Sequence, residues 1–151
     1  MAEKHFYEQE EYTDQYLIPY LKRHLTGFDN TGLSILEVGC AEGGSISSLL
    51  KLGYQVDGIE IEEGRAAIAL DKLRGRSKIV VGDITRAEQV DMGRTYDLII
   101  MRDVIKHIED KATALANLHA MMKEGGHLFI TFPLKYSPYA AHQQNARSWL
   151  K

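Results

Sequence analysis

Apolar residues occur along this chain in short clusters, and helix-spaced apolar residues lie between those clusters. The clusters predict strands at residues 35–38, 54–61, 77–82, 96–101 and 127–132. The spaced residues predict helices at 44–52, from about 62 through 73, and at 110–123. Strands that alternate with helices predict a doubly wound α/β sandwich with a mostly parallel five-stranded sheet and helices on both faces.

The same spacing predicts which helical residues face the sheet. In the helix that runs through Leu73, they are Ala66, Ala69, Leu70 and Leu73, with Gly75 after the end. In the last helix, they are Leu115, Leu118 and Met122, and Gly125-Gly126 is expected to end that helix.

The segment before the first strand, residues 8–25, carries a helical pattern with Thr13 or Asp14 as a possible cap. Pro19 inside it predicts a kink or two short helices. Five aromatic side chains here either pack on the domain or form a lid over a ligand: Phe6, Tyr7, Tyr12, Tyr16 and Tyr20. We expect residues 1–32 to form an N-terminal helical cap.

Candidate ligand-binding residues follow the predicted strands. Gly39, Glu60, Asp83 and Arg102 all stand where a strand ends. Ligands of doubly wound sheets bind at the carboxyl ends of the strands, so these residues predict one shared site.

The loop Gly39-x-Ala41-x-x-Gly44 is one residue short of the dinucleotide-binding pattern Gly-x-Gly-x-x-Gly. Glu60 is placed to accept hydrogen bonds from both ribose hydroxyls of a nucleotide, which disfavours a 2′-phosphate and hence NADP. The alternative is that Glu60 belongs with Glu62 and Glu63 to a solvated acidic cluster that starts a helix.

Two further carboxylates need partners. Glu37 interrupts the apolar run 35–38, so a buried Glu37 must meet either a helix N-terminus or a positively charged ligand. Asp83 either accepts a bond from the exocyclic amine of an adenine, with Ile61 and Ile84 flanking the ring, or caps the next turn.

Composition limits the class of protein. The chain has 151 residues, a net charge of −3 and one cysteine, Cys40. It therefore gives no reason to expect nucleic acid or an anionic membrane as a partner, and it excludes an internal disulfide. An N-terminus without signal-peptide character and the lack of a long apolar run predict a cytoplasmic protein.

Several segments together resemble the ordered motifs of class I S-adenosylmethionine-dependent methyltransferases of the bacterial small-molecule type. They are Glu37-Val38-Gly39-Cys40-Ala41-Glu42-Gly43, Gly58-Ile59-Glu60-Ile61, Gly82-Asp83-Ile84, Tyr96-Asp97-Leu98-Ile99-Ile100 and Gly125-Gly126-His127-Leu128-Phe129-Ile130. The resemblance covers about residues 34–132 and implies a Rossmann-like domain at 33–132, with strand order 3-2-1-4-5, that binds S-adenosylmethionine.

The resemblance also implies roles for single residues. The backbone of Gly39 and Cys40 would contact the methionine part of the cofactor, and Glu37 would lie near its ammonium group. Glu60 would bind the ribose, Ile61 would pack on adenine, and Asp83 with Ile84 would contact the ring edge. Arg102 stands where the family contacts the methionine end through its backbone, and its cationic side chain is unusual there. Asp103 either contacts the cofactor or orders its loop.

The predicted reaction moves a methyl group to an oxygen or nitrogen atom of a small molecule. His107 is the candidate base for a hydroxyl acceptor, or else it orients its loop. Lys106 stands where the resembling motif has glutamate, so no metal is expected. Two alternatives remain, a non-catalytic cofactor-binding or assembly module and an NAD-dependent dehydrogenase, although no Tyr-x-x-x-Lys pair occurs.

Residues 133–151 resemble the start of the family's substrate-binding half. We therefore expect a fragment or a truncated chain in which this tail leads to a missing part. The predicted fifth strand would then be an open sheet edge, which favours a homo-oligomer formed through that strand.

Overall fold

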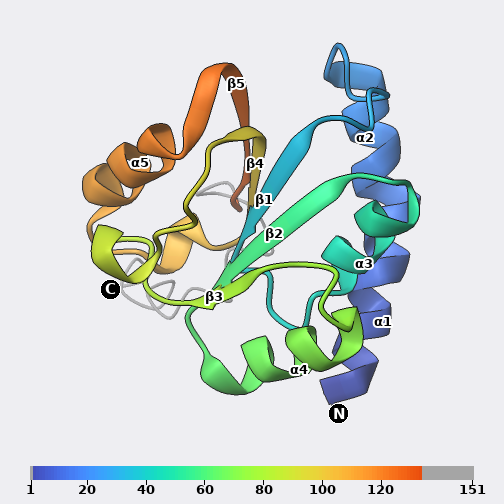
Figure 1. Ribbon diagram of the computed structural model, residues 1–151, viewed down its shortest axis with the longest axis horizontal. Helices are drawn as coiled ribbons and strands as arrows, with labels where there is room; N and C mark the ends of the chain where they lie inside the picture. Colours follow the sequence, from blue (N-terminus) through green and yellow to red (C-terminus); the bar gives the residue numbers. More distant parts are fainter. Residues whose placement is uncertain (1, 134–151) are drawn as a thin grey trace, which may run out of the picture.

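Five strands form one parallel sheet in the computed structural model, which describes residues 2–133 (Figure 1). They are β1 (Ser34–Val38), β2 (Gln55–Glu60), β3 (Ile79–Val81), β4 (Tyr96–Arg102) and β5 (Met122–Thr131). Their order is β3-β2-β1-β4-β5, and every neighbouring pair is parallel. The predicted strand order is therefore confirmed. Most of the predicted tail, residues 134–151, lies outside the described range.

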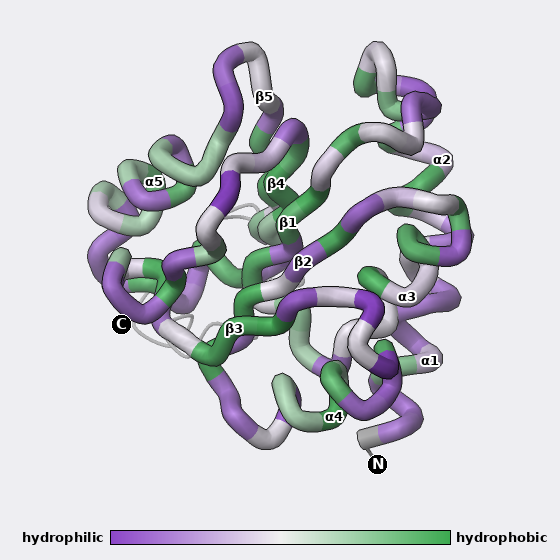
Figure 2. The backbone as a smooth tube through the Cα atoms, in the orientation of Figure 1, coloured by the Kyte–Doolittle hydropathy of each residue, from purple (hydrophilic) through white to green (hydrophobic). Residues whose placement is uncertain are grey.

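Helices cover both faces of the sheet, as predicted. They are α1 (Ala2–Tyr12), η1 (Thr13–Leu17), α2 (Ile18–His24), α3 (Gly44–Lys51), α4 (Glu63–Leu73), η2 (Ala87–Gln89), η3 (Ile105–His107) and α5 (Lys111–Ala120). In β1, Ile35 packs with the core under α2, α3 and α4, whereas Leu36 packs with the core under α5. Figure 2 shows the hydrophobic residues gathered in the central strands, because both faces of those strands are covered.

The N-terminal helical segment differs from the prediction. It begins at Ala2 and passes through a π-helical turn, Thr13–Leu17, directly before Pro19. The N–H of Ile18 reaches back to the carbonyl of Thr13, so the proline enters at the start of α2 and not in a helix interior. Thr13 is therefore not a cap. It lies inside the helical segment and is fully buried.

The last helix and strand also correct the prediction. Helix α5 ends at Ala120, and Met122 begins β5. Gly125 and Gly126 lie inside β5, where φ of Gly125 is +73° and the pairing with β4 shifts register. The two glycines therefore form an irregularity of the strand and do not end the helix.

Two leucines predicted to face the sheet are exposed, Leu70 by 45% and Leu115 by 43%. Smaller neighbours take the inward positions, because Ala69 and Ala114 are fully buried. Of the N-terminal aromatic residues, Phe6 is buried, and four tyrosines are about half exposed: Tyr7, Tyr12, Tyr16 and Tyr20. Within residues 2–133, no helix is long and apolar enough to cross a membrane.

Candidate functional site

A groove runs along the carboxyl ends of the four strands β1 to β4. It consists of two adjoining cavities of about 490 and 650 Å³ that share Gly39, Ile61, Val104 and His107. All the residues predicted to bind cofactor or to act as a base line one cavity or the other. The topology brings them together because the strands are parallel and end at one edge of the sheet.

The smaller cavity is the apolar end of the groove. Ile61 and Ile84 line it, and Ile61 is 67% exposed. Asp83 also lines it and uses Oδ1 to accept bonds from the N–H and hydroxyl of Thr85, at 2.9 and 2.8 Å. The N–H of Thr85 holds the pKa of Asp83 below its usual range. Asp83 therefore caps the next turn, as one interpretation predicted.

Glu60 lies at the middle of the groove. It is 5% exposed, and its two oxygens accept backbone N–H groups from Ala41 at 2.7 Å and from Glu62 at 3.0 Å. Because Glu60 is buried, its interpretation as part of a solvated acidic cluster is wrong. Glu62 and Glu63, by contrast, are exposed. Glu60 ties the end of β2 to the glycine loop, and each of its oxygens retains a second acceptor site.

Glu37 and Arg102 form a buried ion pair at the polar end of the groove, in the larger cavity. Arg102 Nη2 donates to Glu37 Oε1 across 2.8 Å and also bonds the hydroxyl of Ser45. Burial raises the pKa of Glu37, and the guanidinium of Arg102 opposes that rise. Arg102, and not a helix N-terminus, is therefore the partner that the buried carboxylate has in this chain.

The N-terminal helices contribute residues that the sequence did not reveal. Gln9 accepts a bond from the N–H of Gly44 at 2.9 Å and donates to Glu42 at 3.3 Å. Thr13 donates to Ser45 at 2.8 Å, and the ring of Tyr12 lies 5.7 Å from the guanidinium carbon of Arg102. The signal that could have identified them is the spacing Gln9, Thr13 and Leu17, which places polar groups on the face of the helix that is buried.

Two glycines of the loop allow other segments of the chain to approach its backbone closely. Gly39 has φ of +75°, and a Cβ there would lie 2.3 Å from Val104 Cγ2. A Cβ on Gly44 would lie 2.0 Å from the carbonyl oxygen of Phe6. Gly39 thus permits the close approach of the loop after β4, and Gly44 permits the close approach of α1.

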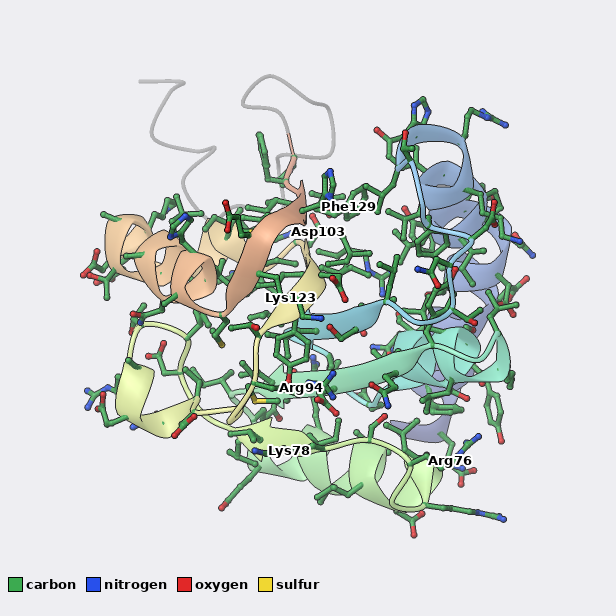
Figure 3. All side chains as sticks on the ribbon, turned by 45° about the horizontal axis from the view of Figure 1, so that its top comes forward. Arg76, Lys78, Arg94, Asp103, Lys123 and Phe129 are labelled. Atoms are coloured by element: carbon green, nitrogen blue, oxygen red, sulfur yellow. The ribbon has the colours of Figure 1, made fainter. Side chains whose placement is uncertain are left out.

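His107 lies where the two cavities join and is exposed. Its backbone N–H bonds the carbonyl of Val104 at 2.9 Å. Asp103, at the end of β4 (Figure 3), has φ of +56°, and its N–H bonds the carbonyl of Thr131. The backbone of Asp103 thus joins this loop to β5, and the exposed His107 lines both cavities.

Cys40 is buried beside the groove, and burial raises the pKa of its thiol. A thiol held in its neutral form is a poor nucleophile. The side chain of Cys40 therefore packs, and its backbone N–H bonds the carbonyl of Ile59 at 3.1 Å.

Relatives of this chain carry out methyl transfer. A family model described as a methyltransferase domain matches residues 9–151. A ubiquinone biosynthesis O-methyltransferase of Mesorhizobium japonicum is 32% identical over 102 residues, which are 66% of this chain and 40% of that protein. A phosphoethanolamine N-methyltransferase of Triticum aestivum is 33% identical over 104 residues, which are 66% of this chain and 20% of that protein. The chain thus spans less than half the length of these relatives.

Solved structures share the fold. A glycopeptide N-methyltransferase superposes with a TM-score of 0.66 and 14% identity over 85% of this chain and 55% of that one. A magnesium protoporphyrin IX methyltransferase from Synechocystis PCC 6803, solved with bound S-adenosylmethionine, gives a TM-score of 0.66 and 22% identity over 83% and 59%. Because the family model covers nearly the whole sequence, the chain belongs to the family of methyltransferase domains.

Proposed function

We propose that this chain binds S-adenosylmethionine in the groove and transfers its methyl group to an oxygen or nitrogen atom of a small molecule. The observation that supports this best is the polarity of the groove, which is apolar at Ile61 and Ile84 and carries a buried ion pair at Glu37 and Arg102. A ligand with an adenine at one end and a charged amino acid at the other fits this gradient. Membership of the methyltransferase-domain family supports the same proposal.

The residues that would hold the cofactor are spread along the groove. Glu60 would accept from the ribose hydroxyls with its remaining acceptor sites, and Asp83 would accept from the adenine amine through Oδ2. Ile61 and Ile84 would flank the ring, and Glu37 Oε2, which has no partner among the described residues, suits the ammonium group. At the polar end, the backbone of Gly39, Cys40 and Asp103 would contact the methionine part.

The chemistry supplied by the bound cofactor is an electrophilic methyl group on a sulfonium. The protein then has to place the acceptor in line and exclude water. His107, at the junction of the cavities, would take the proton from an acceptor hydroxyl. An amine acceptor that is already neutral needs no such base to attack.

We further propose the arrangement of the whole protein. Residues 1–32 act as a cap on the polar end of the groove, and residues 33–132 bind the cofactor. Strand β5, which pairs only with β4 among the described strands, is the proposed edge for homo-oligomer formation. The single buried cysteine suits a reducing cytoplasm.

A second candidate function is a non-catalytic cofactor-binding or assembly module. Incubation of the chain with S-adenosylmethionine labelled in the methyl group and pools of hydroxyl- and amine-bearing metabolites separates the two. Labelled product that disappears in His107→Gln with hydroxyl acceptors supports transfer with His107 as base. Cofactor binding without labelled product supports the module.

A further inference from the structure

The ion pair at the polar end of the groove contains one unused acceptor and one unused donor. Glu37 bonds Arg102 through Oε1 alone, and within residues 2–133 its Oε2 is buried without a partner. Arg102 uses Nη2 for its bonds to both Glu37 and Ser45, and its Nε is buried without a partner in the same range. Because buried polar groups are normally paired, this pair has the capacity for further hydrogen bonds.

The pair is held in place from several directions. Glu37 lies in the central strand β1, and Arg102 is the last residue of the adjacent strand β4. Ser45, which bonds Arg102, is itself bonded by the buried Thr13. The ring of Tyr12 lies 5.7 Å from the guanidinium carbon. The carboxylate and the guanidinium therefore form a preorganised pair of opposite charges that lines the larger cavity.

The charges around the pair select among possible ligands. A lone anion such as phosphate would suit Arg102 but would meet the carboxylates of Glu37 and Glu60. A lone cation would suit Glu37 and the other carboxylates of the lining but would leave Arg102 Nε without an acceptor. A zwitterion whose ammonium and carboxylate groups are joined to one carbon satisfies both residues at once.

We infer that the Arg102 side chain binds the carboxylate of the ligand's amino-acid end, while Glu37 binds the ammonium group of the same end. The groove is thereby specific for ligands whose amino-acid end is intact. This inference rests on the proposed cofactor site and deepens it. The family resemblance places only backbone contacts at this position, whereas here a guanidinium offers a carboxylate a charged hydrogen bond.

Three non-reactive ligands isolate the role of Arg102 in calorimetry on the full chain. S-adenosylhomocysteine carries both charged groups, its decarboxylated analogue lacks only the carboxylate, and 5′-methylthioadenosine lacks the amino-acid end. We expect wild-type protein to bind S-adenosylhomocysteine about 10- to 100-fold more tightly than the decarboxylated analogue, the range for losing a charged hydrogen-bond partner. Affinity for 5′-methylthioadenosine is expected to be lower still.

Substitutions then assign that preference to one side chain. Arg102→Met is expected to bring the ratio of the two dissociation constants close to one. The double variant Glu37→Gln with Arg102→Met, which leaves no unpaired buried charge, should do the same and covers the case in which the single variant fails to fold. The matched control is Arg65→Met, which removes the other arginine lining this cavity, about half exposed, and should keep the wild-type ratio.

The outcomes are distinct. The inference is overturned if the ratio of the two dissociation constants is near one in the wild type, or if a high ratio survives in the Arg102 variants. In either case, binding of S-adenosylhomocysteine still supports the proposed function. Loss of the preference in Arg65→Met but not in the Arg102 variants also overturns it. If no adenosyl ligand binds the wild-type chain, the proposed function fails, and this inference fails with it.

Discussion

Thr13 Oγ1 donates a hydrogen bond to Ser45 Oγ across 2.8 Å, and both side chains are buried. The bond joins the π-helical turn of the N-terminal segment to helix α3, which follows the glycine loop. Because Ser45 also bonds Arg102, the N-terminal helices help to fix the polar end of the groove. The helical cap is therefore part of the site and not an appendage to it.

Removal of this hydrogen bond should lower stability by a modest amount. Thr13→Val keeps the volume but removes the donor, so we expect the free energy of unfolding to fall by about 1 kcal/mol. Urea denaturation measures the change. Thr31→Val, at an exposed loop position, is the matched control and should have little effect. Equal effects of the two substitutions would show that the buried bond contributes nothing.

The two helical glycines Gly44 and Gly64 should respond in opposite ways to alanine. At Gly44 a Cβ would lie 2.0 Å from the carbonyl oxygen of Phe6, so α1 must shift, and we expect destabilisation by about 1 to 3 kcal/mol. Gly64 is an exposed position of α4, and nothing would lie within 4 Å of a Cβ there. Alanine should therefore be neutral or stabilise the fold by up to about 1 kcal/mol. Thermal melts of both variants test the packing of α1, and a stable Gly44→Ala would contradict it.

The loss of folding stability in acid should depend on Asp97. The backbone N–H of Ser34 at 2.8 Å, assisted by Lys123, holds the pKa of Asp97 below its usual range in the folded chain. The stability that this carboxylate contributes is present above its unfolded pKa of about 4 and is lost as pH falls through the lower folded value.

Asp97→Asn should therefore lower stability at pH 7 and flatten its decline in acid. Urea midpoints between about pH 2.5 and 7 measure both effects. Asp71→Asn, exposed on α4, changes the net charge equally and should leave the wild-type slope. An unchanged acid slope in the Asp97 variant would rule out this coupling.

Glu60 and Asp83 should both affect cofactor affinity. We expect Glu60→Ala and Asp83→Ala each to weaken S-adenosylhomocysteine binding by about 1 to 3 kcal/mol, because each removes an acceptor from the groove. Glu63→Ala, which removes an exposed carboxylate that lines neither cavity, is the control and should bind as the wild type does. Unchanged affinity in both groove variants would remove these residues from the site.

Local pattern was enough to predict the sheet. Apolar clusters separated by helices specify parallel strands, and that pattern placed Gly39, Glu60, Asp83 and Arg102 correctly at one edge. Glycine chemistry was less informative, because Gly125 can end a helix or bend a strand equally well, and the pairing of β5 with β4 decided between them.

Contacts between distant residues could not be predicted. Glu37 and Arg102 are 65 positions apart, and no local pattern shows that one neutralises the other. The bond from Thr13 to Ser45 likewise depends on how α1 packs on α3, which Gly44 permits. Leu70 is exposed because the helix turns its alanines toward the sheet, a choice set by the space available there.

The central claim is that the groove binds the adenosyl cofactor of methyl transfer. Calorimetric titration of the 151-residue chain with S-adenosylhomocysteine and, separately, with NAD tests it most directly. We predict saturable one-site binding of S-adenosylhomocysteine and no binding of NAD. Saturable binding of NAD with none of S-adenosylhomocysteine, or binding of neither ligand, would contradict the claim.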